Sequence, residues 1–439
     1  MRVLAGARLR PGAGLRVSAS RMRGQSTAAS GNWPLKISSN GRHLTKQDDT
    51  PFFSVIDTAW CAPQQLTTAQ MDTYVADCAS RGINGIIIEL IESAFSDNAP
   101  ATIDNIQPFT TTNNFSTPNE SYFARVDYLV QACKDAGIVV WMWPLYVGLQ
   151  PGGSQGWSSQ YDGNSQANRE GWGTYVGNRY KAFGNVVWVH GGDGIVSSFT
   201  SINYYINKLI EAWPENDVHS YHGARGDSAF EAADGQSWLS LNNSYIDGSA
   251  PASSALTEYN RSPVRPVFFV EGTYESGSNG GGVVNELWQS LCSGCLAGVA
   301  YGNTDIWTFG GPGYDQDFAS HYDDDGRTYL QYITALIALY DWWKLAPVTN
   351  TSLVTTSLGS GTTQICPMLA SDSTFAWIYS NGANFTLNRA AFSSAHTNIR
   401  IRSYNTTTGA FSTISASVGS SGTQAITVSG QLVIVVDGA

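Results

Sequence analysis

Two short stretches, NVVWVHGGD at residues 185–193 and RPVFFVEGTYE at residues 265–275, decide the fold. Each is a run of β-branched and aromatic residues, which is typical of a parallel strand that is buried on both faces. Each run delivers one acidic side chain where the apolar residues stop, Asp193 in the first and Glu271 in the second. Because a buried bare carboxylate is costly, we expect both acids to lie at the open ends of their strands.

Six further apolar runs between about residues 50 and 345 have the same strand-like character, and helical patterns separate most of them. Such an alternation is typical of parallel β/α units, and eight units predict the α/β class and a closed (β/α)8 TIM barrel. In chain order the expected strands cover 52–60, 83–91, 138–146, 185–193, 217–223, 238–245, 266–272 and 296–307. The clearest helical patterns cover 123–137, 172–183, 201–213, 285–294 and 328–343.

The character of the sequence changes at Pro347. The rest of the chain is rich in Ser, Thr and Gly, with short alternating runs, and SYNTTTGAF at 403–411 predicts two strands around a glycine turn. A compact antiparallel β-sandwich is the natural expectation. We therefore expect a disordered or targeting leader over 1–32, a (β/α)8 barrel over 33–346 and a small β-sandwich over 347–439.

The composition favours a neutral ligand on which aromatic rings can stack, such as a sugar. Only 13% of the residues are charged, 12% are aromatic, and there are 45 glycines. The first thirty residues hold six Arg and no acid, so the remainder has 18 basic against 35 acidic residues and a net charge of −17. This acidity argues against nucleic acid as a partner. No stretch predicts a membrane span, and we expect a monomer that binds an oligosaccharide or polysaccharide.

The cysteines and the leader bear on the compartment. The chain has six Cys, and Cys292 and Cys295 form a CxxC with no second pair, so small buried residues are favoured over a zinc site. We expect no metal and no cofactor. The leader lacks the apolar core of a secretory signal, although secretion or an extracellular location suits the expected substrate. Sequons at Asn114, Asn242, Asn384 and Asn405 would permit glycosylation in a secreted eukaryotic protein.

The two acids at strand ends are the minimal apparatus of a glycoside hydrolase. For Glu271 the flanking Pro266 and Gly272 leave no other evident reason for an acid. For Asp193 the alternative is a turn residue, because the glycines around it make a tight bend in which Asp is welcome.

Further polar candidates lie at other strand ends. Asp57 either binds a sugar hydroxyl or caps its loop, and the two alternatives are evenly matched. His222 could hydrogen-bond a sugar or orient a carboxylate, whereas His190 faces either the site or the interior. Asn243 is a possible polar contact with the ligand.

Three aromatic residues at strand ends, Trp143, Tyr274 and Trp307, could stack on a sugar ring, with core packing as the alternative. Glu275 is expected to be a loop residue that supports Glu271, and the acidic run 323–325 is expected to be solvated.

With the strands placed, the order of motifs resembles the apiosidase-like glycoside hydrolases of family 140 and their relatives, whose barrel precedes a small collagen-binding-type sandwich. The likeness runs from about Pro34 to the C-terminus. It is carried by PLKISSNGRHLTKQDDTPFFSVIDTAW, FARVDYLVQACKDAGIVVWMWP, NRYKAFGNVVWVHGGD, PVFFVEGTYE, YGNTDIW and SYNTTTGAF, in the family's order. Asp57 and Trp60 stand in the family's DTAW motif, which adds Trp60 to the substrate-binding residues.

The resemblance implies that Asp193 is the acid/base and Glu271 the nucleophile, which is the pair that the strand ends indicate independently. A retaining, double-displacement reaction would follow if the two carboxyl groups lie about 5 to 5.5 Å apart. The family's named activity is removal of apiose-linked side chains from plant pectin; other retaining specificities and a non-catalytic carbohydrate- or matrix-binding protein on a decayed barrel remain alternatives. Glu89 and Glu92 depart from the family, whose second strand is less acidic; they line the subsites, or Glu92 begins a solvated loop.

Overall fold

The computed structural model describes residues 32–148, 155–194, 196, 198–246 and 250–439. The expected leader over 1–32 lies outside these residues, apart from Asn32.

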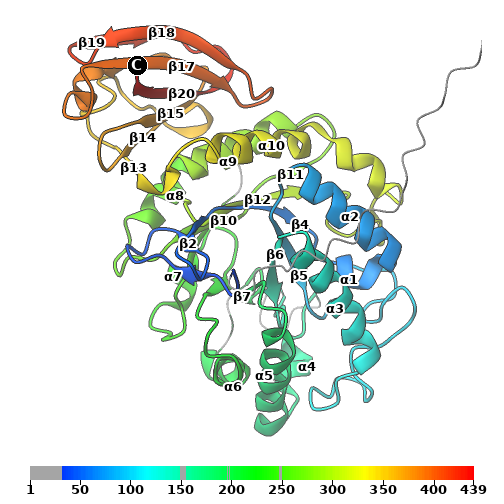
Figure 1. Cartoon of the computed structure of the whole chain (residues 1–439). Coiled ribbons are helices and arrows are strands. Elements are labelled where there is room, and N and C mark those ends of the chain that lie inside the picture. The colour runs from blue at the N-terminus through cyan, green and yellow to red at the C-terminus, as the bar shows by residue number, and fades with distance from the viewer. Residues whose placement is uncertain (1–31, 149–154, 195, 197, 247–249) are drawn as a thin grey trace, which may run out of the picture. The chain divides into compact units, whose positions relative to one another are not determined.

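Eight parallel strands form the central barrel, as the sequence predicted (Figure 1). They are β4 (Ser54–Thr58), β5 (Gly85–Glu89), β6 (Val139–Trp143), β7 (Val186–Gly191), β8 (His219–His222), β9 (Asn242–Tyr245), β10 (Val267–Glu271) and β12 (Gly298–Asn303). Hydrogen-bonded neighbours follow the order β8-β7-β6-β5-β4-β12-β10-β9, and each strand falls within a predicted segment. The carboxyl ends of all eight strands therefore meet at one rim of the barrel.

The barrel closes at a seam between β8 and β9 through individual hydrogen bonds instead of a regular ladder of strand pairing. The backbone N–H of Leu241 donates to the carbonyl of His219 at 3.0 Å. The Asn243 side chain donates to the carbonyl of Tyr221 at 2.7 Å and accepts from the backbone N–H of Ala229 at 2.7 Å. The buried Asn243 thus satisfies backbone groups at the seam, and the structure does not bring it to a ligand.

Helices surround the strands, and the size of the side chains on their buried faces determines how closely they approach one another. The longer ones are α2 (Thr68–Ser80), α3 (Glu120–Asp135), α5 (Gln166–Lys181), α6 (Phe199–Ala212), α8 (Pro251–Tyr259), α9 (Gly280–Leu291) and α10 (Asp325–Ile337). Short helices α1 (Ala62–Gln65), α4 (Ser158–Asp162) and α7 (Ala229–Ala233) lie between them along the chain. Helices α5 and α6 approach closely because a side chain on Gly173 or Gly177 would collide with the backbone of α6.

Two layers of apolar side chains hold the barrel together. Inside it, Trp141 of β6 packs on Phe268 of β10 with ring centroids 4.5 Å apart. The same inner cluster includes Leu35, Leu44 and Phe52, which belong to or flank the antiparallel strands β1 (Lys36–Ile37), β2 (Leu44–Thr45) and β3 (Pro51–Phe52). A larger outer cluster fills the space between strands and helices. Because side chains fill the interior of the barrel, a functional site is expected at the carboxyl ends of the strands.

The C-terminal part is an antiparallel sandwich, also as predicted. Its main sheet has the order β13 (Leu345–Pro347), β14 (Cys366–Ala370), β15 (Ala376–Asn381), β20 (Gln431–Gly438), β17 (Asn398–Asn405) and β18 (Phe411–Gly419). Strands β16 (Phe385–Asn388) and β19 (Thr423–Ile426) pair separately and share a buried core with it. The expected turn between β17 and β18 holds Gly409 at φ 68°. The main sheet begins at Leu345, two residues before the expected boundary.

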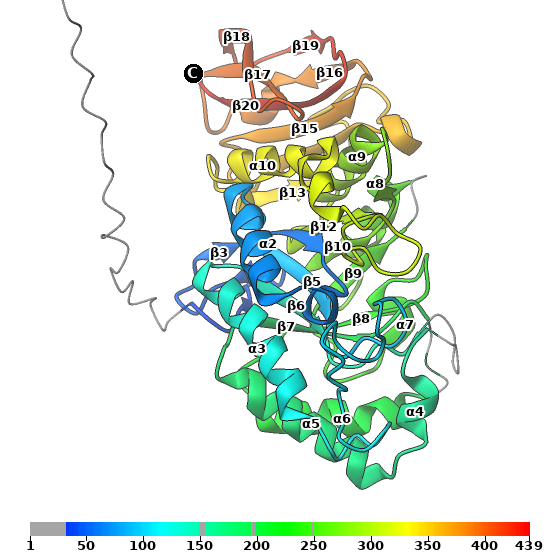
Figure 2. The same ribbon diagram turned by 90° about the vertical axis from the view of Figure 1, so that its right-hand side faces the viewer.

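Figures 1 and 2 both show the sandwich lying over α9 and α10. Trp288 of α9 stacks on Tyr379 of β15, and the Tyr379 hydroxyl donates to the Asn285 side chain at 2.6 Å. The sandwich is thus packed against the outside of the barrel by buried aromatic contacts.

The cysteines are all free and buried, so the CxxC residues Cys292 and Cys295 are small core residues. The sequon residue Asn242 is buried and bonds to Glu258 at 2.9 Å, which leaves no access for a glycan. Within the described ranges, no helix is long and apolar enough to cross a membrane.

Candidate active site

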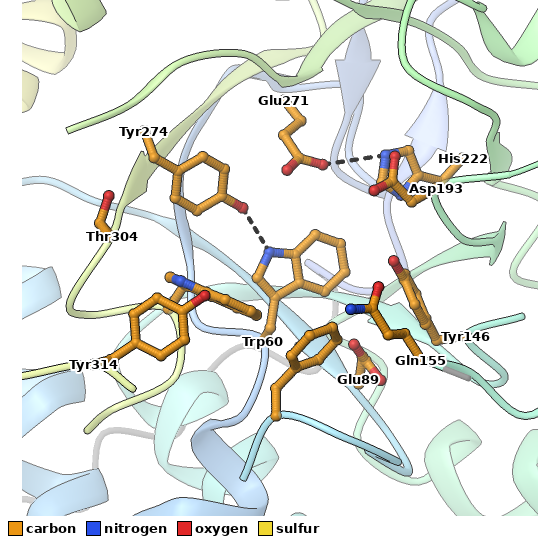
Figure 3. Close-up of a pocket in the computed structure, with 12 residues that line it drawn as sticks. Trp60, Glu89, Tyr146, Gln155, Asp193, His222, Glu271, Tyr274, Thr304 and Tyr314 are labelled. Carbon is orange, nitrogen blue, oxygen red and sulfur yellow. Dashed lines mark hydrogen bonds and ion pairs between the residues drawn. The ribbon is translucent and has the colours of Figure 1, made fainter. Parts of the chain in front are cut away.

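A pocket of about 330 Å³ opens at the carboxyl ends of the barrel strands (Figure 3). Its walls come from the ends of β4, β5, β7, β8, β10 and β12 and from the loops that follow strands. The lining residues are Trp60, Glu89, Phe95, Tyr146, Gln155, Asp193, His222, Glu271, Tyr274, Thr304, Trp307 and Tyr314. The structure therefore brings Asp193 and Glu271 into one cavity, with four of the other predicted residues: Trp60, His222, Tyr274 and Trp307.

Asp193 is held by a bend just beyond β7. Gly191 and Gly192 take φ values of 82° and 144°, and Asp193 itself takes 27°. A Cβ on Gly191 would lie 2.6 Å from the carbonyl oxygen of His222, and one on Gly192 would collide with the Tyr146 ring. The two glycines thus let the chain turn sharply at the rim, and Asp193 follows in the half-buried wall of the pocket.

Glu271 is the last residue of β10, and its side chain is 13% exposed. His222 Nε2 lies 3.3 Å from Glu271 Oε2. The pairing of β10 with β9 becomes irregular between Phe269 and Glu271, which marks the point where the strand leaves the barrel wall. The apolar run thus fixes the backbone and leaves the carboxylate at the rim.

Tyr245, at the end of β9, connects the two acids. Its hydroxyl donates to Asp193 Oδ1 at 2.7 Å, and its ring packs on His222 with centroids 4.8 Å apart. Burial, together with Glu271 and Asp193, raises the pKa of Tyr245, so the hydroxyl keeps its proton. A continuous line of contacts therefore runs from Glu271 through His222 and Tyr245 to Asp193.

The sequence analysis missed Tyr245 by choosing Asn243 on the same strand. Side chains two residues apart on a strand share a face, but only the last one reaches the rim. Tyr245 ends β9, whereas Asn243 lies one layer deeper at the seam. The signal that could have found Tyr245 was its place as the last residue of the expected strand.

The predicted aromatic residues differ in whether they reach the pocket or are buried beneath it. Trp60 lines the pocket, stacks parallel to His222 at 6.0 Å and donates from its indole N–H to the Tyr274 hydroxyl at 2.9 Å. Trp307 also lines the pocket, edge-on to Phe95. Trp143 is fully buried and packs edge-on to Trp60, 4.7 Å away, so it supports Trp60 and does not line the cavity.

Two predicted polar residues lie outside the pocket because their side chains complete buried networks. Asp57 accepts from Arg327 Nε and from the Tyr74 hydroxyl, each at 3.0 Å. His190 bonds through Nε2 to His219 at 2.9 Å and through Nδ1 to the Tyr205 hydroxyl at 2.8 Å. Burial lowers the pKa of His190, which keeps it neutral. Neither side chain is free to meet a sugar.

The remaining acids have distinct surroundings. Glu89 ends β5 in the pocket wall. Glu92 accepts from the backbone N–H of Ser96 at 2.9 Å and from the Ser96 hydroxyl, so it organises its loop. Glu275 is buried and accepts from the backbone N–H of Gly326 at 3.0 Å, which ties it to the start of α10 and not to Glu271. Among the described residues, no cluster of His, Cys, Asp or Glu is suited to hold a metal ion.

Comparison with known proteins agrees with this geometry. A family model described as the apiosidase-like catalytic domain matches residues 38–344. A solved structure titled "Glycoside hydrolase" superposes with a TM-score of 0.80 at 18% identity, covering 93% of this chain and 97% of its own. A glycoside hydrolase family 5 protein from Bacteroides vulgatus ATCC 8482 does so with a TM-score of 0.79 at 19% identity, covering 92% and 93%. No curated protein matches the chain.

At these identities the solved structures establish the barrel and the sandwich as a shared fold. The family match adds the class of protein, which is a glycoside hydrolase. The match spans most of the barrel, and the chain belongs to the apiosidase-like family.

Proposed function

We propose that this enzyme removes a side-chain sugar from a plant or microbial polysaccharide by a retaining mechanism, with Glu271 as the nucleophile and Asp193 as the acid/base. The observation that carries the proposal is that both acids line one pocket, and that each has its own partner, Tyr245 for Asp193 and His222 for Glu271. Two carboxyl groups on either side of a glycosidic bond suffice for this chemistry.

In the first step Glu271 attacks the anomeric carbon while Asp193 gives its proton to the leaving oxygen. In the second step Asp193 takes a proton from water, which attacks the same carbon and releases Glu271. Because Tyr245 donates to Oδ1 of Asp193, the acid's own proton belongs on Oδ2. Tyr245 thus fixes which oxygen of Asp193 delivers the proton.

His222 has a matching effect on the nucleophile. The ring places Nε2 3.3 Å from Glu271 Oε2, beside the carboxylate that attacks the anomeric carbon. The stacked ring of Trp60 and the tilted ring of Tyr245 hold the imidazole in that orientation. The two acids therefore have different neighbours, His222 for Glu271 and Tyr245 for Asp193, which suits their different roles.

The shape of the site supports removal of a terminal sugar. A cavity of about 330 Å³ holds one or two sugar rings, and Trp60 and Trp307 offer aromatic surfaces on which a sugar can stack. Apiose is the first candidate because of the family to which the chain belongs. Since such polysaccharides lie outside cells, action at an extracellular location is part of the proposal.

The test is a screen of the purified protein against 4-nitrophenyl glycosides, including the β-D-apiofuranoside, and against pectic and microbial polysaccharides. Proton NMR of the first-formed product gives its anomeric configuration. We expect turnover with retention, and a loss of at least about 1000-fold in kcat for both Glu271→Gln and Asp193→Asn on unactivated substrates. Inversion would refute the nucleophile, whereas sugar binding with no turnover by the wild type would indicate a binding protein.

A further inference from the structure

The pocket contains a third carboxyl group that the two-acid mechanism does not use. Glu89 ends β5, lines the cavity and is only 2% exposed. Figure 3 shows Glu89 at the foot of the view and Glu271 at its top, with the Trp60 ring between them. Glu89 therefore borders a different part of the cavity from the two reacting acids.

Glu89 has an unsatisfied polar atom. Its Oε2 is buried and forms no hydrogen bond with any residue that the structure describes. Its strand neighbour Trp143, which is paired with it in register, also has a buried Nε1 without a partner among those residues. A buried polar group left unpaired costs about 1 to 3 kcal/mol, so a lining carboxyl of this kind calls for a ligand.

The environment also determines the charge of Glu89. Burial, and next the nearby Glu92, raise its pKa well above 4.5. Among the described residues, no cation opposes this rise in the pKa. Burial thus favours the protonated carboxyl, which has one O–H donor and one carbonyl acceptor, over the carboxylate.

We propose that Glu89 binds a hydroxyl group of the sugar in this pocket through its carboxyl group, and that it selects sugars bearing that hydroxyl. The inference rests on the proposed function. A site in which Glu89 hydrogen-bonds a sugar hydroxyl discriminates strongly against a sugar that lacks this hydroxyl, because Glu89 would then remain buried and unpaired.

This role differs from those of the two acids. A neutral donor and acceptor can be replaced by an amide, which has the same shape and also offers an N–H and a C=O. A nucleophile or a proton-transferring acid cannot be replaced in this way. The comparison of Glu89→Gln with Glu89→Leu therefore separates a substrate-binding role from a catalytic one.

The experiment measures kcat/KM of the wild type, Glu89→Gln and Glu89→Leu with 4-nitrophenyl β-D-apiofuranoside, or with the aryl glycoside that the screen finds best. It repeats the measurement with the monodeoxy analogues of that sugar. We expect Glu89→Leu to lose about 10- to 100-fold and Glu89→Gln to stay within about 5-fold of the wild type. The wild type should prefer the parent sugar over each deoxy analogue, as measured by the ratio of the two kcat/KM values. For the analogue that lacks the hydroxyl bound by Glu89, this ratio should be much smaller in Glu89→Leu.

Glu275→Gln is the matched control, since Glu275 is a buried carboxyl outside the pocket. It should leave kcat/KM and the deoxy discrimination unchanged, and thermal melts of every variant report folding. Equal losses in Glu89→Gln and Glu89→Leu, or a discrimination that Glu89→Leu preserves, would overturn the inference. If the wild type hydrolyses no glycoside, the proposed function fails. Glu89 can then still be tested by measuring how D-apiose quenches the tryptophan fluorescence of the wild type and of Glu89→Leu. Equal quenching in the two proteins, or no quenching, refutes the role of Glu89.

Discussion

His222 Nε2 lies 3.3 Å from Glu271 Oε2, and the imidazole stacks on Trp60 and packs against the tilted ring of Tyr245. Tyr245 in turn holds Asp193 through a 2.7 Å hydrogen bond. One aromatic assembly therefore positions both acids, and a change in any member should disturb catalysis before it disturbs folding.

Replacing His222 by Phe keeps a ring in the stack and removes the nitrogen that faces Glu271. We expect kcat/KM to fall about 10- to 100-fold because Glu271 loses the polar group that lies against its carboxylate. Steady-state kinetics with an aryl glycoside measure the loss, and a thermal melt close to that of the wild type shows that the fold is intact. An undiminished rate would mean that His222 only packs against Glu271.

Replacing Tyr245 by Phe tests whether Tyr245 fixes the proton that Asp193 gives to the leaving group. Without the hydroxyl, that proton can reside on either oxygen of Asp193, so acid assistance weakens. We expect about a 10-fold loss of kcat/KM with a phenyl glycoside, which needs acid assistance, and little loss with a 2,4-dinitrophenyl glycoside, which does not. Equal losses with both leaving groups would argue for a role in binding alone.

Azide rescue distinguishes the two acids from one another. In Asp193→Ala, azide should attack the glycosyl-enzyme and restore turnover of a dinitrophenyl glycoside, giving a glycosyl azide of retained configuration. In Glu271→Ala no such intermediate can form, so any azide product should be inverted. NMR of the azide products reads both outcomes, and the opposite pattern would exchange the assigned roles.

The fold was predictable because its signals are local. Most of the barrel strands are apolar runs, and Asp193 and Glu271 stand where two of these runs stop; β8 and β9 are polar instead. Depth within the barrel is not local, so the sequence pointed to Asn243 instead of Tyr245 and named the buried Trp143 together with Trp60, which does line the pocket.

Partners distant in sequence account for the other differences. Asp57 could not be recognised as structural without Arg327, which lies 270 residues further along the chain. Gln155 and Tyr314 reach the pocket from loops whose course no periodic pattern predicts.

The buried ion pair between Arg327 and Asp57 should matter for stability. Both side chains are fully buried, and Arg327 also contacts Asp77. Arg327→Met leaves Asp57 buried without its cation, and we expect a loss of about 3 to 5 kcal/mol in unfolding free energy, measured by urea denaturation. The control is Lys181→Met, which breaks the exposed pair with Glu215 and should cost less than about 1 kcal/mol. Similar losses in the two variants would contradict this account.

His43 should make the stability of the protein sensitive to acid. It lies edge-on to Trp342 with a buried Nδ1 that has no partner among the described residues, and burial lowers its pKa from 6.5 to about 4. As the pH falls below 6.5, the unfolded chain binds a proton that the folded protein refuses until about pH 4. The contribution of neutral His43 is thus complete above pH 6.5 and declines as the pH falls toward 4.

His43→Phe retains a ring against Trp342 and removes the titration, while the acidic groups common to both proteins cancel in the comparison. Relative to this variant, the wild type should lose about 1 to 2 kcal/mol of unfolding free energy between about pH 7 and about pH 4.5, allowing for partial solvent screening. Urea denaturation at a series of pH values measures the difference. A difference independent of pH would show that His43 titrates alike in the folded and unfolded chains, and would contradict the prediction.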